Sequence, residues 1–226
     1  NNKGSARAFD VRTGKRIWTF HTIPKKGEYG YDTWLNDSAE VNGNTGVWTQ
    51  ISVDTDLNMA YLPVESATSD FYGGKRPGNN LFANSLVAVD LTTGERKWHY
   101  QMIHHEIWDL DNSSQPMLMD VTVDGKLVKA VAITSKMNML YVFDRATGKP
   151  VFPIPEVKVE KGNVPGEWYS PTQPMPKIKY ARNSVEADQL IDFTPELRAK
   201  ANFFFNDTAT TEIYTPPVVS TAKQLG

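Results

Sequence analysis

Apolar and polar positions alternate over short stretches of this chain, which predicts a protein built almost entirely from β-strands. Residues 47–54 (VWTQISVD) and 59–64 (MAYLPV) alternate in this way, and a polar turn at 55–58 (TDLN) separates them. Residues 128–134 and 139–143 repeat the arrangement later in the chain. Each pair of segments therefore predicts a β-hairpin.

A second pattern occurs three times, at residues 8–18 (AFDVRTGKRIW), 88–98 (AVDLTTGERKW) and 142–152 (VFDRATGKPVF). It predicts a hairpin whose tight turn is held by Asp and Thr side chains, with Gly at positive φ. Hairpins repeated along a chain indicate a β-propeller, in which four-stranded blades stack around an axis. We expect the aromatic residue that ends each copy to pack between adjacent blades; these residues are Trp18, Trp98 and Phe152.

Three segments interrupt the hairpins. Residues 21–46 and 65–84 are rich in Gly, Asn, Asp and aromatic residues, a composition typical of binding loops. Residues 150–180 form a third excursion that is rich in proline. Because proline removes backbone donors and restricts φ, we expect the proline-rich part to be an ordered strap over the blades, without regular strand or helix.

The clearest helix signal lies at 194–200, where Thr194 is a predicted N-cap and Pro195 occupies the first helical position. Residues 203–214 resemble the conceptual translation of a sequencing-adaptor oligonucleotide, so we assign them no function.

The chain begins without Met and enters a predicted strand almost at once. We therefore interpret residues 1–226 as one partial propeller domain from a longer protein.

Composition narrows the possible functions. The 226 residues are 40% hydrophobic and 22% charged, as in a soluble globular protein. The net charge of −2 and the pI of about 6.1 provide no basic surface for nucleic acid. The absence of cysteine excludes disulfides and thiolate metal sites. No stretch reaches the roughly 18 apolar residues of a membrane-spanning helix.

The densest candidate chemistry is at residues 104–111 (HHEIWDLD), directly after a predicted strand. Asp109 lies beside the indole of Trp108, and an apolar neighbour tends to raise a carboxyl pKa and suit it to general-base work. Lys136 follows 136 − 109 = 27 residues later, at the turn of the next hairpin. Corresponding ends of neighbouring blades converge on one face, so Asp109 and Lys136 can share a site. A solvated turn lysine is the alternative for Lys136.

Other polar residues have simpler interpretations. His104 and His105 are expected to be hydrogen-bonded loop residues, because no third histidine lies at metal-site spacing. Asp111 and Asp120 are expected at turns or strand ends. The polar residues around Gly73 and Gly74 either contact a ligand or hold their own loop; they are Asp70, Lys75 and Arg76.

The three repeats, residues 70–80 (DFYGGKRPGNN), residues 104–111 and the Asp109–Lys136 spacing together resemble quinoprotein dehydrogenases that use pyrroloquinoline quinone (PQQ). The resemblance is closest to the membrane-associated glucose and polyol dehydrogenase branch. It implies an all-β, eight-bladed propeller, of which this chain would form about three to five blades. It also implies that Asp109 is the base that takes the substrate hydroxyl proton, while hydride passes to the quinone. Lys136 would hydrogen-bond the quinone oxygens, and we expect Trp108 to contact the cofactor.

The resemblance implies further partners. A divalent cation, usually Ca²⁺, would lie beside PQQ, with ligands outside this chain. The substrate would be a small alcohol, polyol or sugar, and ubiquinone or a cytochrome would accept the electrons. The resemblance also implies a periplasmic location and an inner-membrane anchor in a segment outside this chain. In one departure from the family pattern, Glu106 replaces the usual Asp.

Two other classes remain open. One is a non-catalytic propeller scaffold that resembles outer-membrane assembly lipoproteins with the same hairpin repeat. The other is a carbohydrate-binding propeller without redox chemistry. The segment 104–111 and Lys136 argue against the scaffold, because a scaffold needs neither.

Overall fold

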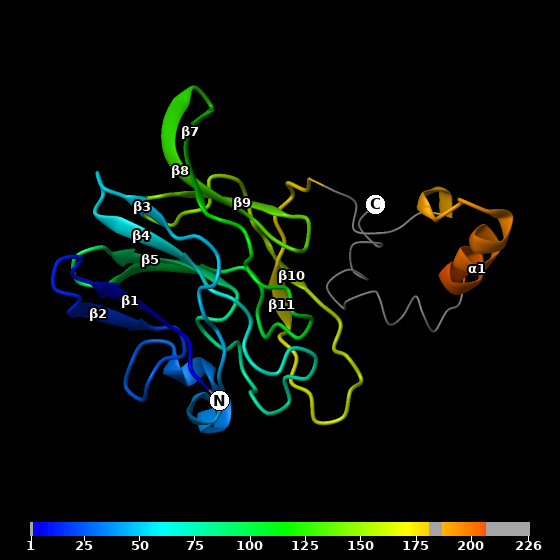
Figure 1. Cartoon of the computed structure of the whole chain (residues 1–226), viewed down its shortest axis with the longest axis horizontal. Coiled ribbons are helices and arrows are strands. Elements are labelled where there is room, and N and C mark those ends of the chain that lie inside the picture. Colours follow the sequence, from blue (N-terminus) through cyan, green and yellow to red (C-terminus); the bar gives the residue numbers. More distant parts are fainter. Residues whose placement is uncertain (1, 181–186, 207–226) are drawn as a thin grey trace.

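The structure is a computed structural model that describes residues 2–180 and 187–206, and its strands form four antiparallel sheets (Figure 1). The first is a hairpin of β1 (Ser5–Phe9) and β2 (Arg16–His21). The second sheet contains β3 (Ser52–Asp54), β4 (Met59–Pro63), β5 (Ser85–Asp90) and β6 (Arg96–Gln101). The third contains β7 (Met117–Val123), β8 (Lys126–Thr134) and β9 (Leu140–Asp144).

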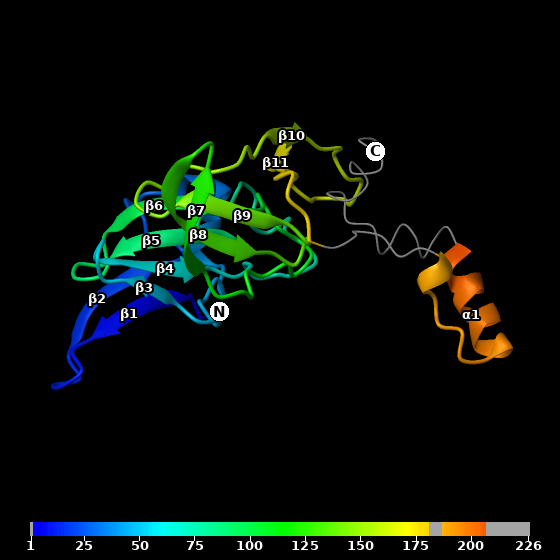
Figure 2. The same ribbon diagram turned by 90° about the horizontal axis from the view of Figure 1, so that it is seen from above.

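These three sheets stack on one another in chain order, as neighbouring propeller blades do (Figures 1 and 2). The largest apolar cluster joins β3–β6 to β7–β9 and includes Tyr61, Leu86, Trp98, Val131 and Phe143. A second cluster joins β1–β2 to β4 and β5. Only the β3–β6 sheet has four strands, so the described chain is part of a propeller.

The turn of each repeat has the predicted chemistry. Oδ1 of Asp10 accepts the N–H groups of Arg12 and Thr13, and Gly14 N donates to Asp10 O at 2.8 Å. The turns that begin at Asp90 and Asp144 repeat this arrangement. The glycines have φ of 68°, 75° and 71° at Gly14, Gly94 and Gly148.

The repeated tryptophans pack between sheets, as predicted. The ring of Trp18 lies against Gly94 of the next repeat, where an added Cβ would be 2.6 Å from the ring. The ring of Trp98 covers Gly148 in the same way, at 2.5 Å. Phe152 differs, because it packs against a cluster within its own sheet, formed by β8 and β9 residues.

The third repeat does not complete its hairpin. Its turn forms, but the returning segment makes only an isolated bridge between Phe143 and Pro150, with Val151 N donating to Val142 O at 2.8 Å. The physical reason is Pro150, which has no N–H for a regular ladder.

The strap, defined here as residues 153–176, is ordered but contains short strands that we did not predict. β10 (Glu156–Lys158) and β11 (Thr172–Pro174) form an antiparallel pair. The expectation of no regular strand was therefore wrong over these residues. Pro174 occupies the last position of β11, where the loss of one donor is tolerated.

The inserts lack long strands and helices. Residues 21–46 contain two 3₁₀ helices, η1 (Tyr31–Thr33) and η2 (Leu35–Glu40). Residues 65–84 contain neither helix nor strand, apart from a bridge at Ala67.

Asp120 was expected at a turn or strand end. This expectation was wrong, because Asp120 lies inside β7 and pairs with Lys129.

After a short 3₁₀ helix, η3 (Ala187–Gln189), the predicted C-terminal helix forms as α1 (Pro195–Asn206), which lies apart from the sheets (Figures 1 and 2). Thr194 caps it, since its Oγ1 accepts Leu197 N at 3.2 Å. Of the predicted adaptor-derived segment 203–214, residues 207–214 lie outside the described part of the chain.

Candidate active site

Residues 104–111, called the site loop from here on, follow β6 and meet three other parts of the chain. The insert 65–84 contributes Arg76, the β8–β9 turn contributes Lys136, and the strap contributes Glu167. Figure 1 shows these connections gathered at one end of the sheets. Neighbouring blades bring their loops to a common end, which explains how distant segments converge here.

Asp109 and Lys136 lie together, as their spacing predicted. Lys136 Nζ is 3.8 Å from Asp109 Oδ2 and donates to the backbone oxygen of Asp109 at 2.8 Å. The Asp109 side chain is 47% exposed and the Lys136 side chain 36%. Asp109 has φ of 54°, in the left-handed region that Asp adopts more readily than most residues. The two charged groups are thus adjacent and reachable from solvent.

Asp111 was expected only at a turn or strand end, and the structure gives it contacts at the site instead. Its Oδ2 lies 3.3 Å from Lys136 Nζ, and its Oδ1 accepts Ser66 N at 3.0 Å. It therefore links the lysine to the insert 65–84. The paired Asp-x-Asp spacing in the site loop was the signal that could have identified it.

The surroundings of Asp109 raise its pKa. Partial burial is the largest cause, and the negative charges of Asp111 and Asp70 add to it, while Lys136 acts in the opposite direction. A carboxyl group with a raised pKa is a stronger base once ionised, which suits it to accept a proton.

The two histidines of the site loop are hydrogen-bonded loop residues. The Nδ1–H of His105 donates to Gly78 O at 2.9 Å, and its Nε2 hydrogen-bonds Glu167 Oε1 at 2.9 Å. Both side chains of that pair are 1% exposed. Burial lowers the pKa of His105, although Glu167 opposes the shift. His104 contacts Gln101 and the strap.

Arg76 holds the insert 65–84 and the site loop together. Its side chain is buried, and its guanidinium donates to Asn80 Oδ1 and Ser69 O, each at 3.0 Å, and to Glu106 O. Of the two interpretations left open, the structure favours a residue that holds its own loop. The strap joins at the same place, because Glu167 Oε2 accepts Gly73 N at 2.6 Å.

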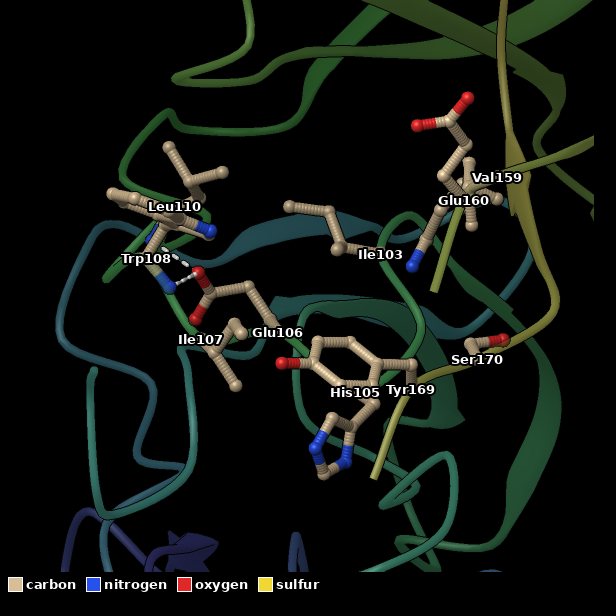
Figure 3. Close-up of a pocket in the computed structure, with 11 residues that line it drawn as sticks. Ile103, His105, Glu106, Ile107, Trp108, Leu110, Val159, Glu160, Tyr169 and Ser170 are labelled. Carbon is tan, nitrogen blue, oxygen red and sulfur yellow. Dashed lines mark hydrogen bonds between the residues drawn. The ribbon is translucent and has the colours of Figure 1, made fainter. Parts of the chain in front are cut away.

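A small cavity lies between the site loop and the strap (Figure 3). Its volume is about 40 Å³, enough for water rather than for a cofactor. Its walls include Ile103, Glu106, Trp108, Leu110 and Tyr169. Trp108, which directly precedes Asp109 in the sequence, therefore contributes to the wall of this cavity. Its contact with a cofactor stays a prediction.

No group of three or more His, Asp or Glu side chains is arranged to hold a metal ion within residues 2–180 and 187–206. Over the same residues, no helix has the length and apolar character needed to cross a membrane.

The stacked sheets are blades of a β-propeller. The loops at one end of these blades bring the carboxylate of Asp109 and the ammonium group of Lys136 together, so this is a propeller with a candidate site on its loops. The protein family described as "PQQ: Glucose/ethanol/alcohol dehydrogenase, beta-propeller domain" matches residues 1–225. The chain belongs to this family, and the predicted family and all-β propeller fold are confirmed.

Individual relatives agree with this assignment. The quinoprotein glucose dehydrogenase of Gluconobacter oxydans is 41% identical over 179 residues, which cover 77% of this chain and 22% of the relative. The quinate/shikimate dehydrogenase (quinone) of Acinetobacter baylyi is 35% identical over 208 residues, 88% of this chain and 25% of the relative. The chain therefore spans a quarter or less of the length of these relatives.

A solved structure shows the same fold. The quinohemoprotein alcohol dehydrogenase of Pseudomonas putida superposes with a TM-score of 0.64 at 29% identity, and the match covers 78% of this chain and 27% of that protein.

Proposed function

We propose that the full-length protein containing this chain is a PQQ-dependent dehydrogenase. It would oxidise a CH–OH group of an alcohol, polyol or sugar to a carbonyl or lactone and pass the electrons to ubiquinone or a cytochrome. The observation that carries the proposal is the exposed pair of Asp109 and Lys136, 3.8 Å apart, in a chain of this family. A half-exposed carboxylate is open to a substrate that arrives from solvent.

The residues present fit such a cofactor. An ammonium group has three N–H donors, and within the described residues Lys136 directs its Nζ to Asp109 O and Asp111 Oδ2. These two acceptors fix the position of Nζ and leave it able to donate to a cofactor carbonyl oxygen. PQQ, when bound, supplies the two-electron oxidant that accepts hydride from the carbinol carbon.

The chain's own residues then have distinct tasks. Asp109 accepts the proton of the substrate hydroxyl on its carboxylate, and its raised pKa suits this step. Lys136 holds the cofactor and places positive charge beside it, and electrostatic stabilisation of this kind is often the largest catalytic contribution. We retain Trp108 as a predicted cofactor contact. We propose that a divalent cation, Ca²⁺ in the first instance, is held by residues outside this chain, and that the protein acts in the periplasm.

The test uses the full-length protein as purified apoprotein. It is titrated with PQQ, with and without Ca²⁺, and dye reduction is followed with glucose, polyols, quinate and simple alcohols. Turnover that requires PQQ supports the proposal and identifies the substrate. A folded protein that neither binds PQQ nor reduces dye would favour the scaffold class instead.

Asp109→Asn is the decisive variant. The amide cannot accept the hydroxyl proton, so kcat is expected to fall by about 10²- to 10⁴-fold. PQQ affinity should remain, because the backbone oxygen of Asp109 still accepts from Lys136. Asp10→Asn, in the remote turn of the first repeat, is the matched control and should keep its turnover. Unchanged turnover in Asp109→Asn would remove Asp109 as the base.

A further inference from the structure

Glu106 belongs to the site loop and is buried, with only 3% of its surface exposed. Its Oε1 accepts the N–H of Trp108 and, at 3.1 Å, the N–H of Leu110 (Figure 3). These two donors are on either side of Asp109 in the sequence. A single oxygen atom therefore holds the backbone both before and after the proposed base.

The backbone of Asp109 needs such support. Its φ of 54° is in the left-handed region, which Asp adopts more readily than most residues but which is still less favourable than the right-handed region without supporting contacts. The N–H groups of Trp108 and Leu110 would lose their partner if the Glu106 oxygen were removed, and unpaired backbone donors are unfavourable in a protein interior. The loop would then relax to a conformation that pairs them elsewhere.

Glu106 is itself fixed in place, so it can transmit this support. The buried guanidinium of Arg76 donates to Glu106 O. On the other side, Asn84 Nδ2 donates to Leu110 O at 3.1 Å. The insert 65–84 thus anchors both ends of the segment that Glu106 spans.

We propose that Glu106 is a positioning residue. By accepting the N–H groups of Trp108 and Leu110, it holds Asp109 in the conformation that keeps its carboxylate beside Lys136. Glu106 does not reach the reacting atoms in this role. The catalytic consequence rests on the proposed function of Asp109, whereas the backbone consequence does not.

The role requires an acceptor oxygen and not a charge. Burial raises the pKa of Glu106, and Oε1 can accept both hydrogen bonds whether or not the carboxyl group is ionised. Glu106→Gln retains such an oxygen and should therefore hold the backbone as Glu106 does. Glu106→Leu has a similar volume but no acceptor, and it should fail to hold the backbone.

The first test measures amide hydrogen exchange in the full-length apoprotein, without cofactor or turnover. A peptide that spans residues 107–111 is followed by mass spectrometry. Exchange should stay slow in the wild type and in Glu106→Gln, and become at least about tenfold faster in Glu106→Leu, because protection depends on the local opening equilibrium. Val89→Ala, a truncation in the buried face of β5, controls for a general loss of stability.

The second test measures kcat against pH in the PQQ-loaded enzyme. Glu106→Leu should lower kcat by about 10- to 100-fold, since misplacing a catalytic group by about 1 Å has effects of this size. Its fall in kcat on acidification should also move to higher pH. The reason is that Lys136 lowers the pKa of Asp109 and would be farther away. Glu106→Gln should keep the wild-type profile.

The outcomes separate the possibilities. Slow exchange and normal kcat in Glu106→Leu would overturn the proposal, and so would a Glu106→Gln protein as impaired as Glu106→Leu. If Glu106→Leu does not fold, hydrogen exchange in Glu106→Gln still tests the positioning role. Fast exchange of residues 107–111 in that variant would contradict the role. If the wild type shows no PQQ-dependent turnover, the proposed function fails while the exchange result still tests the positioning role.

Discussion

The interface between repeats and the site loop are stabilised by different means. At the interface, the same contact recurs, with the ring of Trp18 on Gly94 and the ring of Trp98 on Gly148. In the site loop, no contact is repeated, and the partners come from three separate segments, namely the insert 65–84, the β8–β9 turn and the strap. Examples are the hydrogen bonds of Asp111 with Ser66 and of His105 with Glu167. Repeated packing explains why the blades stack, and unrepeated hydrogen bonds explain where a site can form on the stack.

Two lysines illustrate the difference within one kind of contact. Lys97 Nζ lies 3.2 Å from Asp90 Oδ2 beside a repeat turn, and Lys136 Nζ lies 3.3 Å from Asp111 Oδ2 in the site. The lysine side chains are 41% and 36% exposed. The N···O distances and the exposed fractions of the two lysines are nearly the same, so the ion pair alone does not distinguish a structural lysine from a proposed catalytic one. A second contact does, because Lys136 also donates to the backbone oxygen of Asp109.

The largest predicted effect on stability is at the repeated interface. In Gly148→Ala the new Cβ would meet the Trp98 ring at 2.5 Å, and φ is 71°. We expect a loss of about 2 to 5 kcal/mol, from left-handed strain of about 1–2 kcal/mol and overpacking of about 1–3 kcal/mol. The urea midpoint of the full-length apoprotein measures it.

Gly125→Ala is the matched control for that substitution. Gly125 has φ of 73° in the β7–β8 turn, and nothing lies within 4 Å of its added Cβ. Only the left-handed strain, about 1–2 kcal/mol, should appear. Equal losses in the two variants would show that ring packing on the glycine contributes nothing.

The next effect is a pH dependence that comes from His99 in β6. Burial, followed by the nearby charge of Arg96, lowers the pKa of His99 to about 4. The unfolded chain takes up this proton near pH 6.5, so the histidine favours unfolding increasingly as the pH falls from about 6.5 to about 4. Stability present above pH 6.5 should decline by at most about 3 kcal/mol across that window.

Comparing urea midpoints at pH 7 and pH 5 in the wild type and in His99→Gln isolates this contribution. The variant should lose less stability on acidification than the wild type. His99 packs against the rings of Tyr29 and Phe82, whereas His105 is paired with a carboxylate. An identical acid response in the wild type and His99→Gln would place the sensitivity elsewhere, with the site loop as the next candidate.

The smallest effect on stability is expected for Lys136→Ala, which should change the free energy of unfolding by no more than about 1 kcal/mol, because exposed ion pairs contribute little. Its effect on the proposed function should be large, with lower PQQ affinity and lower kcat. Lys97→Ala should show the same small change in stability and normal PQQ binding. Unchanged PQQ affinity and rate in Lys136→Ala would remove Lys136 from the site.

Features that depend on local chemistry or on repetition could be predicted from the sequence. The Asp-x-x-Thr-Gly turns were recognisable because each forms within a few residues. The proximity of Asp109 and Lys136 followed from the topology of adjacent blades. Roles carried over from the resemblance, such as those of Asp109, Lys136 and Trp108 toward the cofactor, remain predictions.

Features that depend on the path of a long loop could not be predicted. Glu167 reaches His105 across 62 residues, and Arg76 reaches Glu106 across 30. Neither pair has a periodic signal, since the inserts and the strap have no regular register. The β10–β11 pair was missed for a related reason, because proline content argued against strands even though the ladder needed only three residues on each side.

The strap also has a consequence for the order of events during folding. The β3–β4 and β5–β6 hairpins pair residues that are close in the sequence, whereas the hydrogen bond between His105 and Glu167 closes a loop of 62 residues. Because closing a longer loop costs more conformational entropy, we expect the hairpins to form first. The site loop then acquires its final contacts only when the strap closes over it.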